Sequence, residues 1–278
     1  MSAPGAAPAR KIAVVGAGKM GFALLEGLRA SGLAGAGTIV VEPEPTPRLE
    51  ALCADGSFAL TRAAPATQTP PDALLLAIKP QMLEAAAPAL QALVGPGTLI
   101  VSVLAGKTIA NLAGRFPAAR AFVRAMPNTP AAIGRGVTGA FASEGVDAAG
   151  RDFAHRLLGA VGAVEWVESE ALIDAVTAVS GSGPAYVFLM AECLAAAGVE
   201  LGLPEDLSTR LARGTIAGAG ELMRVNPDTS AETLRRNVTS PGGTTAAALD
   251  VLMADDGLRP LLARAVAAAR RRAGELAG

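Results

Sequence analysis

The sequence predicts an α/β protein in which a doubly wound, mostly parallel sheet domain is followed by an all-α domain. Three observations support this fold class. Short apolar segments alternate with segments of helical periodicity in the first part of the chain. A glycine-rich turn separates the first strand from the first helix, and strand-like segments end by about Glu170. We therefore expect a flexible tail at residues 1–9, a sheet domain at residues 10–168 and a helical domain at residues 169–278.

Each strand of the sheet domain is expected where an apolar run has strand length. The runs at residues 73–78 and 99–104 are unbroken, as in strands that are buried on both faces of a parallel sheet. The other expected strands are residues 11–15, 38–41 and 121–124, with residues 137–142 and 163–167 as edge strands. Helices are expected at residues 22–28, 48–54, 82–93, 109–112 and 152–158.

The remainder of the chain is expected to be helical. A long helix at residues 172–202 is interrupted at residues 180–184, and further helices are expected at residues 204–225 and 231–238, from about Thr244, and from about Leu258. Ala and Gly are frequent in these helices, and they allow close contact but bury little area each. We therefore expect this domain to dimerise, with a self-sufficient helical bundle as the alternative.

Composition and charge argue against several classes of function. The chain has 24 Lys and Arg against 25 Asp and Glu, so we expect neither nucleic-acid nor membrane binding. Uninterrupted apolar runs stay shorter than the ~18 residues that a spanning helix needs. The two cysteines, Cys53 and Cys193, and the single histidine, His155, have no metal-ligand neighbour at short spacing. We expect a cytoplasmic protein with reduced cysteines, no metal site and a surface or packing role for His155.

The glycine-rich turn has the G-x-G-x-x-G pattern, and its residues are Gly16, Ala17, Gly18, Lys19, Met20 and Gly21. Between a strand and a helix, this pattern is typical of a Rossmann-type dinucleotide-binding domain. Gly16 would form the tight turn, Gly18 would leave room for a pyrophosphate, and Gly21 would let helix and strand pack closely. The helix start offers free N–H groups to phosphates. The alternative is a tight glycine turn without a ligand.

Glu42 ends the second expected strand, where an acidic residue would accept hydrogen bonds from an adenosine ribose. The first basic residue after it in the sequence is Arg48, so a 2′-phosphate would meet a carboxylate without an adjacent cation. On this argument alone, NADH is slightly favoured over NADPH. The alternative is that Glu42 faces solvent and selects neither cofactor.

Four further segments complete a specific set of motifs. They are Ala77-Ile78-Lys79-Pro80, Met126-Pro127-Asn128-Thr129-Pro130, Ser180-Gly181-Ser182-Gly183-Pro184-Ala185-Tyr186, and Asn237-Val238-Thr239-Ser240-Pro241-Gly242-Gly243-Thr244-Thr245. With the glycine motif and in this order, they resemble the pyrroline-5-carboxylate reductase family over nearly the whole chain. The resemblance implies reduction of Δ1-pyrroline-5-carboxylate to L-proline by hydride transfer from NADPH or NADH, which is the last step of proline biosynthesis.

The resemblance also implies a set of cofactor contacts. Besides the glycine motif, these are Ala77, Ile78, Lys79, Pro80, Ala105 and Asn237, to which the position at the end of the second strand adds Glu42. Glu42 departs from the family, which often has a small polar residue and nearby basic ones after this strand, so the choice between NADPH and NADH stays open. Asn128 and Thr129 could bond a ligand or equally cap their own loop.

The segment at residues 240–245 precedes a helix, and its glycines bare the backbone, which favours a carboxylate site. The resemblance implies that the N–H groups of Thr244 and Thr245 hold the substrate carboxylate. It places the Thr245 hydroxyl near the imine nitrogen, as the catalytic group. The further substrate contacts that it implies are Glu170, Asn237, Ser240 and Gly243. The alternative is an ordinary capped helix after a glycine turn.

An imine needs little catalytic help, because protonation to an iminium already makes its carbon electrophilic, so the enzyme mainly positions two reactants. The resemblance further implies a homodimer of interleaved helical domains, with assembly to a decamer possible. Two other classes of protein are alternatives. A β-hydroxyacid dehydrogenase would need a lysine on the helix around residues 180–193, which has none. A nucleotide-sensing regulator would give no reason for the Gly-Gly-Thr-Thr segment.

Overall fold

The computed structural model describes residues 10–34, 37–66 and 69–277, so the tail expected at residues 1–9 lies outside the described residues. The chain divides into two compact units. The first comprises Met1–Gly181 together with Arg270–Gly278, and the second comprises Ser182–Ala269. The sequence places the division earlier, after residue 168, where the strands end. The segment between the two positions packs on the sheet, with Ile173 and Ala178 fully buried.

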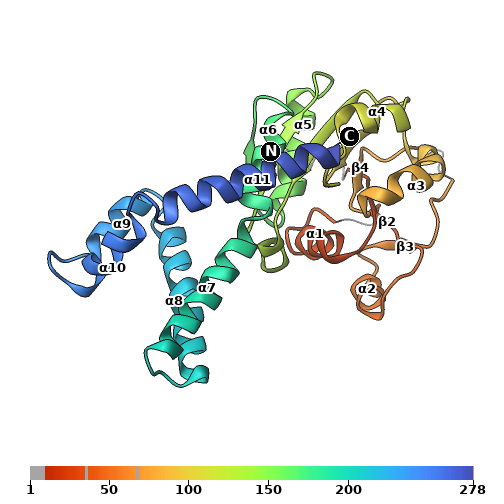
Figure 1. The fold of residues 1–278 in the computed structure, drawn as a ribbon. Helices are drawn as coiled ribbons and strands as arrows, with labels where there is room; N and C mark the ends of the chain where they lie inside the picture. The colour runs from red at the N-terminus through yellow and green to blue at the C-terminus, as the bar shows by residue number, and fades with distance from the viewer. Residues whose placement is uncertain (1–9, 35–36, 67–68, 278) are drawn as a thin grey trace, which may run out of the picture. The chain divides into compact units, whose positions relative to one another are not determined.

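The first unit contains an eight-stranded sheet of order β3-β2-β1-β4-β5-β6-β7-β8 (Figure 1). All neighbouring strands are parallel except β6 and β7, which are antiparallel. The strands are β1 (Ile12–Val15), β2 (Ile39–Val41), β3 (Ala59–Thr61), β4 (Ala73–Leu76), β5 (Leu99–Ser102), β6 (Ala121–Met126), β7 (Gly136–Ala142) and β8 (Gly162–Trp166). The predicted fold class is therefore confirmed: an α/β, doubly wound and mostly parallel sheet, followed by helices.

Alternate residues of each central strand face opposite sides of the sheet and form two separate cores. Ile12 and Val14 pack with α1 (Lys19–Ala30), α2 (Pro47–Cys53) and α5 (Ala148–Gly159). Ala13 and Val15 pack with α3 (Leu83–Leu90) and α4 (Ile109–Arg115) on the other face. Both faces of β1 and β4 are buried, which explains why these strands read as unbroken apolar runs.

Two details of the sheet differ from the expectation. The strand β3 was not predicted, because its three residues, Ala-Leu-Thr, are too few to show a period and none is fully buried. The segment at residues 137–142 was expected at an edge, and this was wrong: β7 lies between β6 and β8, and the two edge strands are β3 and β8. A single apolar run shows that a strand exists, but not which strands it pairs with.

After β8 the chain forms the short helix α6 (Leu172–Val176) and the π-helical turn η4 (Thr177–Gly181). Asn128, at the end of β6, donates through Nδ2 to the carbonyl and the hydroxyl of Ser180, both at 3.3 Å. Its Oδ1 accepts from the N–H of Val137 at 2.9 Å. The loop after β6 is thereby joined to the π-turn, where π-helical geometry often accompanies functional segments.

The second unit is entirely helical in its described residues. It contains α7 (Gly183–Glu200), α8 (Glu205–Val225), α9 (Ala231–Asn237), α10 (Thr244–Leu252) and the first part of α11 (Leu258–Ala277). In Figure 1, α7 and α8 run side by side, and a Cβ on Gly198 would come within 2.1 Å of the Ser208 hydroxyl. Only Ser208 and Ala212 are buried in this unit, so most of its apolar side chains face outward.

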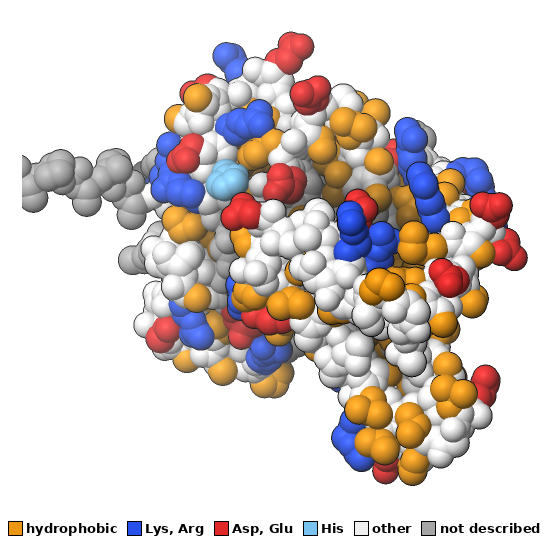
Figure 2. All heavy atoms as spheres, turned by 90° about the vertical axis from the view of Figure 1, so that its left-hand side faces the viewer, with side chains coloured by type: hydrophobic (Ala, Val, Ile, Leu, Met, Phe, Trp, Pro, Cys, Tyr) orange, Lys and Arg blue, Asp and Glu red, His pale blue; other side chains and the backbone are white. Residues whose placement is uncertain are grey.

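Hydrophobic side chains are exposed on the helical unit, as Figure 2 shows where α7 and α8 meet at the lower end of the view. Large examples are Phe188, Leu189, Leu211 and Leu222. The stretch Leu172–Glu200 is long and apolar enough to cross a membrane by length and composition alone. A large exposed apolar surface marks an interaction site. A second protein chain can bury such a surface just as a membrane can.

We predict that Gly162→Ala destabilises the fold, whereas Gly159→Ala does not. Gly162 has φ +144°, and a Cβ there would approach the Gly136 carbonyl oxygen to 2.0 Å; at Gly159 the nearest atom would lie at 4.0 Å. The backbone conformation alone should cost Gly162→Ala about 1–3 kcal/mol. Urea unfolding at one fixed protein concentration measures this, and equal stability of the two variants would contradict it.

Candidate active site

The first part of the site is the edge of the sheet at which the parallel strands β1, β2, β4 and β5 end. The strand order runs outward in both directions from the neighbours β1 and β4, so the chain reverses its winding between them. In open α/β sheets, ligands bind in the crevice outside the carboxyl ends of the strands at such a point. The glycine motif directly follows β1 at this edge, as the sequence analysis expects.

The glycine motif is shaped by contacts that exclude side chains at two positions. Gly16 has φ +91°, and a Cβ on it would lie 2.8 Å from the backbone of Ala77 and Ile78. A Cβ on Gly21 would lie 2.1 Å from the Gly16 carbonyl oxygen. Gly16 and Gly21 are therefore required by the packing of the turn against α1 and the end of β4.

Gly18 differs from these two glycines, because a Cβ on it would meet nothing within 4 Å. It is the N-cap of α1 and is exposed, as is Lys19, and no side chain caps the helix. The helix start therefore presents free N–H groups and its positive end toward open space. These features fit a dinucleotide pyrophosphate, which needs close approach to the backbone and a helix N-terminus.

Glu42 is held against the glycine motif. Its Oε2 accepts a hydrogen bond from the N–H of Ala17 at 2.7 Å, and its Oε1 accepts from the N–H of Glu44 at 3.4 Å. Glu42 is partly buried, so its carboxylate does not face solvent alone, as the alternative in the sequence analysis would require. The carboxylate lies at the end of β2, where a ribose would be recognised.

Arg62 is a residue near this position that sequence reasoning missed. The N–H of Glu42 donates to the carbonyl of Thr61 at 2.9 Å, which brings Arg62 beside Pro43. The Arg62 guanidinium donates to the Pro43 carbonyl at 3.3 Å and forms no ion pair with any described residue. Arg48, the nearest cation in the sequence, is instead paired with Glu26 at 3.1 Å. A cation that is not adjacent in the sequence therefore lies beside Pro43, the residue that follows Glu42.

The remaining sheet-unit residues follow β4 and β5 at the same edge. Ala77 and Ile78 are partly buried beside Gly16, Lys79 is exposed, and Pro80 begins a short 3-10 turn, η1 (Pro80–Met82). Ala105 is exposed in the loop after β5. The structure thus brings the glycine motif, the end of β4 and the loop after β5 to one edge.

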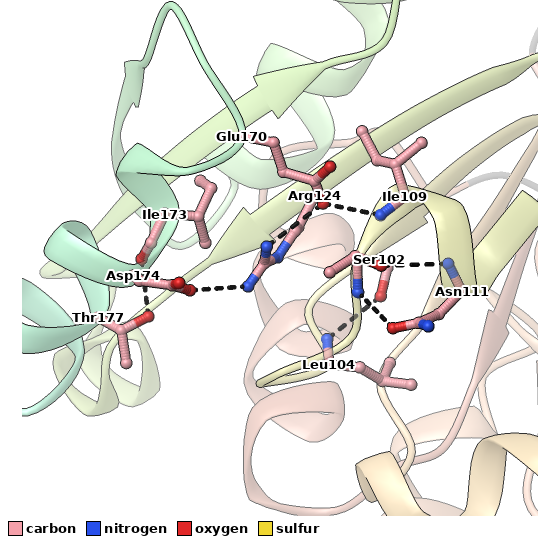
Figure 3. A network of polar contacts seen from close by, with 10 residues as sticks. Ser102, Leu104, Ile109, Asn111, Arg124, Glu170, Ile173, Asp174 and Thr177 are labelled. Atoms are coloured by element: carbon pink, nitrogen blue, oxygen red, sulfur yellow. Dashed lines mark hydrogen bonds and ion pairs between the residues drawn. The ribbon is translucent and has the colours of Figure 1, made fainter. Parts of the chain in front are cut away.

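Glu170 belongs to a polar network beneath the loop after β5 (Figure 3). Its Oε1 accepts from the N–H of Ile109 at 2.7 Å and from the guanidinium of Arg124 at 3.3 Å. Among the described residues, nothing donates to Oε2. Arg124 also pairs with Asp174 at 3.1 Å. No signal in the sequence distinguished Arg124, since it lies in an apolar strand.

Of the two open possibilities for Asn128, the structure favours the structural one, because its amide is used by Ser180 and Val137. Thr129 starts the 3-10 turn η3 (Thr129–Ile133).

His155 is exposed on α5, and its Nδ1 accepts a hydrogen bond from Trp166 Nε1 at 3.3 Å. The pKa of the Cys53 thiol is raised, chiefly by partial burial. A smaller fraction of the thiol is therefore the reactive thiolate. No cluster of three potential metal ligands occurs among the described residues.

A separate candidate binding position lies in the helical unit, at the start of α10. Gly243 is the N-cap, its N–H donates to the Ser240 carbonyl at 3.1 Å, and no side chain caps the helix. Thr244 and Thr245 open the helix and are exposed, as is Asn237 at the end of α9. Uncapped N–H groups at a helix start bind a carboxylate well.

Comparison with protein families identifies both units. The family described as pyrroline-5-carboxylate reductase dimerisation matches residues 170–276. The family described as NADP oxidoreductase coenzyme F420-dependent matches residues 11–106. The pyrroline-5-carboxylate reductase of Pseudomonas aeruginosa is 40% identical over 269 residues, which cover 96% of this chain and 97% of that protein. The reductase of Vibrio alginolyticus is 37% identical, with 96% and 97% covered.

Solved structures agree with these relatives. A pyrroline-5-carboxylate reductase from Coxiella burnetii superposes with a TM-score of 0.89 at 34% identity, covering 97% of this chain and 99% of that one. The pyrroline carboxylate reductase of Plasmodium falciparum, solved with NADP bound, superposes with a TM-score of 0.76 at 26% identity, covering 97% and 98%.

We predict that Gly18→Ala and Gly21→Ala separate binding from folding. The Gly18 methyl group would enter only open space, so stability should fall only by the small difference between Gly and Ala at an N-cap, while dinucleotide affinity falls. The Gly21 methyl group would collide with the Gly16 carbonyl, so stability should fall by about 1–3 kcal/mol. Thermal unfolding and fluorescence titration with NADPH and NADH test both effects. Wild-type affinity in Gly18→Ala would show that no ligand approaches there.

Proposed function

Because the chain belongs to the pyrroline-5-carboxylate reductase family, it is an oxidoreductase of proline biosynthesis, and we propose how its residues carry out the reaction. The substrate, Δ1-pyrroline-5-carboxylate, is a cyclic imine with one carboxylate. Its reduction adds a hydride to the imine carbon, C2 of the pyrroline ring, which becomes C5 of L-proline, and a proton to the nitrogen, which becomes the amine. Family membership sets aside the hydroxyacid dehydrogenase and the nucleotide-sensing regulator.

The sheet unit is proposed to hold NADPH or NADH. The N–H groups at the start of α1 would bind the pyrophosphate, Gly18 would leave room for it, and Glu42 would face the adenosine ribose. Residues Ala77, Ile78, Lys79, Pro80 and Ala105 would line the nicotinamide side, with Asn237 as a further contact. When bound, the reduced nicotinamide supplies the hydride.

The helical domain of the sequence analysis, residues 169–278, is proposed to hold the substrate; it contains the second compact unit together with α6, η4 and the end of α11. The observation that supports this most strongly is the uncapped start of α10 after Ser240 and Gly243. The exposed N–H groups of Thr244 and Thr245 can hold one carboxylate, and the helix dipole adds to this attraction. Asn237 is proposed to contact the ring. Glu170 is a further proposed contact, through its free Oε2.

Thr245 is proposed as the catalytic residue. Its hydroxyl would hydrogen-bond the imine nitrogen and keep the imine carbon aligned for hydride addition. The proton on that nitrogen comes from the substrate or from solvent, since an iminium forms readily. The rate advantage would then arise mainly from holding two reactants in a reactive geometry.

Glu42 and Arg62 are proposed to balance the cofactor preference. Glu42 favours the 2′-hydroxyl of NADH, because a carboxylate repels a phosphate. Arg62, beside Pro43 and without an ion pair in the described chain, can neutralise the 2′-phosphate of NADPH. Both cofactors would be accepted, with NADH slightly favoured as expected from Glu42.

The protein is a homo-oligomer, because residues 170–276 match the dimerisation domain of the family. We propose a dimer in which a second copy covers the exposed apolar faces of α7 and α8, and a decamer built from such dimers. The apolar stretch Leu172–Glu200 then lies in a protein interface and not in a membrane. We propose a cytoplasmic location, in keeping with two cysteines that form no disulfide.

We predict that the protein oxidises NADPH and NADH when pyrroline-5-carboxylate is added, and that Thr245→Ala lowers kcat/KM by about 10- to 100-fold, as for the loss of one hydrogen bond to a charged group. Thr245→Ser keeps the hydroxyl and should retain most activity. Absorbance of the reduced cofactor measures the rates, with a 3-hydroxy acid and oxidised cofactor as the control. Unchanged turnover in Thr245→Ala would remove Thr245 from the mechanism.

We predict that Arg62→Gln lowers kcat/KM about tenfold with NADPH and leaves it unchanged with NADH, because only NADPH carries the phosphate. Glu42→Gln should shift the preference toward NADPH. Arg48→Gln is the matched control, since Arg48 is already paired with Glu26. Initial rates measured with NADPH and with NADH test these predictions for Arg62 and Glu42. Equal loss with both cofactors in Arg62→Gln would mean that Arg62 does not read the phosphate.

A further inference from the structure

We propose that Arg124 and Glu170 are positioning residues for cofactor binding: Arg124 fixes Glu170, and Glu170 fixes the loop between β5 and α4 on which Ala105 lies (Figure 3). The proposal rests on the proposed function, because this loop is assigned to the cofactor there. All residues of the network belong to the first compact unit.

Arg124 is unusual for its burial. It lies in β6 with only 3% of its surface exposed, and its Nε has no hydrogen-bond partner among the described residues. A buried guanidinium is costly unless it is paired. Two carboxylates compensate for this cost, Glu170 at 3.3 Å and Asp174 at 3.1 Å. An arrangement with one cation, two anions and one unsatisfied nitrogen is a poor way to gain stability, and this suggests another purpose.

Glu170 connects this cation to the start of α4. Its Oε1 accepts from the N–H of Ile109, the first residue of the helix, at 2.7 Å. The same first turn is also capped by Thr108 and Asn111, which form a reciprocal capping box at 3.0 and 3.1 Å. The Thr108 side chain caps the N–H of Asn111 but not that of Ile109, so Glu170 supplies the partner for the Ile109 N–H.

The loop between β5 and α4 is consequently held at both ends. At its beginning, the Ser102 hydroxyl accepts from the N–H of Leu104 at 3.3 Å, and the N–H of Val103 donates to the Leu76 carbonyl at 3.0 Å. At its end, Glu170 holds Ile109. Ala105 lies exposed between these anchors, at the edge where parallel strands present ligands. Fixing the loop before the cofactor arrives reduces the entropy lost on binding.

Asp174 provides a matched control within the network. It pairs with the same guanidinium from α6, but in the described part of the chain it makes no hydrogen bond to the loop between β5 and α4. A change at Asp174 therefore weakens the pairing of Arg124 and leaves the bond to Ile109 in place. Any effect on stability should be shared by the two carboxylates, whereas an effect on cofactor binding should be specific to Glu170.

The test is the affinity of the oligomeric protein for NADPH without substrate, measured by fluorescence titration beside thermal unfolding. Glu170→Ala should weaken NADPH binding by about three- to tenfold, which is the range for one lost hydrogen bond. Glu170→Asp keeps the charge for Arg124 but is too short to reach Ile109, so it should weaken binding similarly even if Glu170→Ala fails to fold. Glu170→Gln keeps an acceptor for Ile109 and should bind nearly as wild type.

Asp174→Asn should lower the melting temperature and leave NADPH affinity within about twofold of wild type. Weakening of NADPH binding in Asp174→Asn as large as in Glu170→Asp would overturn the proposal. Unchanged affinity in Glu170→Asp, with only the KM for pyrroline-5-carboxylate raised, would also overturn it. Wild-type protein that binds NADPH but does not reduce the substrate would contradict the proposed function and leave this proposal standing.

Discussion

The direct packing of the Gly16 backbone against Ala77 is the contact on which the rest of the site depends. No side chain fits between the turn after β1 and the end of β4, where a Cβ would lie 2.8 Å from three backbone atoms. Because of this contact, the start of α1 is placed over the point at which the winding of the sheet reverses. Glu42 strengthens the arrangement by accepting the Ala17 N–H. The start of α1, the Glu42 carboxylate and the loops after β4 and β5 then share one edge.

Much of this arrangement could be predicted, because it depends on patterns local in sequence. Buried parallel strands are continuously apolar, and a glycine turn between strand and helix has few alternatives. Residues that depend on strand pairing were missed. Arg62 approaches Pro43 only because β3 pairs with β2, and β3 is too short to be recognised. In the sequence, Arg124 is only one charge in an apolar strand. Its partners, Glu170 and Asp174, lie after β8 and reach it only in the folded chain.

The two units differ in how far each can satisfy its own apolar surface. The sheet unit buries its strands between helices on both faces and has two closed cores. The helical unit buries almost none of its large side chains within one chain. Its many alanines and glycines suit close helix contact, and its apolar faces call for a second copy. Oligomerisation is therefore part of how this half of the chain becomes stable, and the dimerisation family that it matches has the same implication.

The central proposal is that the glycine-lined edge of the sheet holds the dinucleotide and that the uncapped start of α10 holds the substrate carboxylate. A crystal structure with NADP⁺ and L-proline bound tests it most directly. The account predicts the pyrophosphate on the N–H groups of Gly18 and Lys19, and the proline carboxylate on those of Thr244 and Thr245. A pyrophosphate bound away from α1, or a carboxylate bound away from α10, would contradict it.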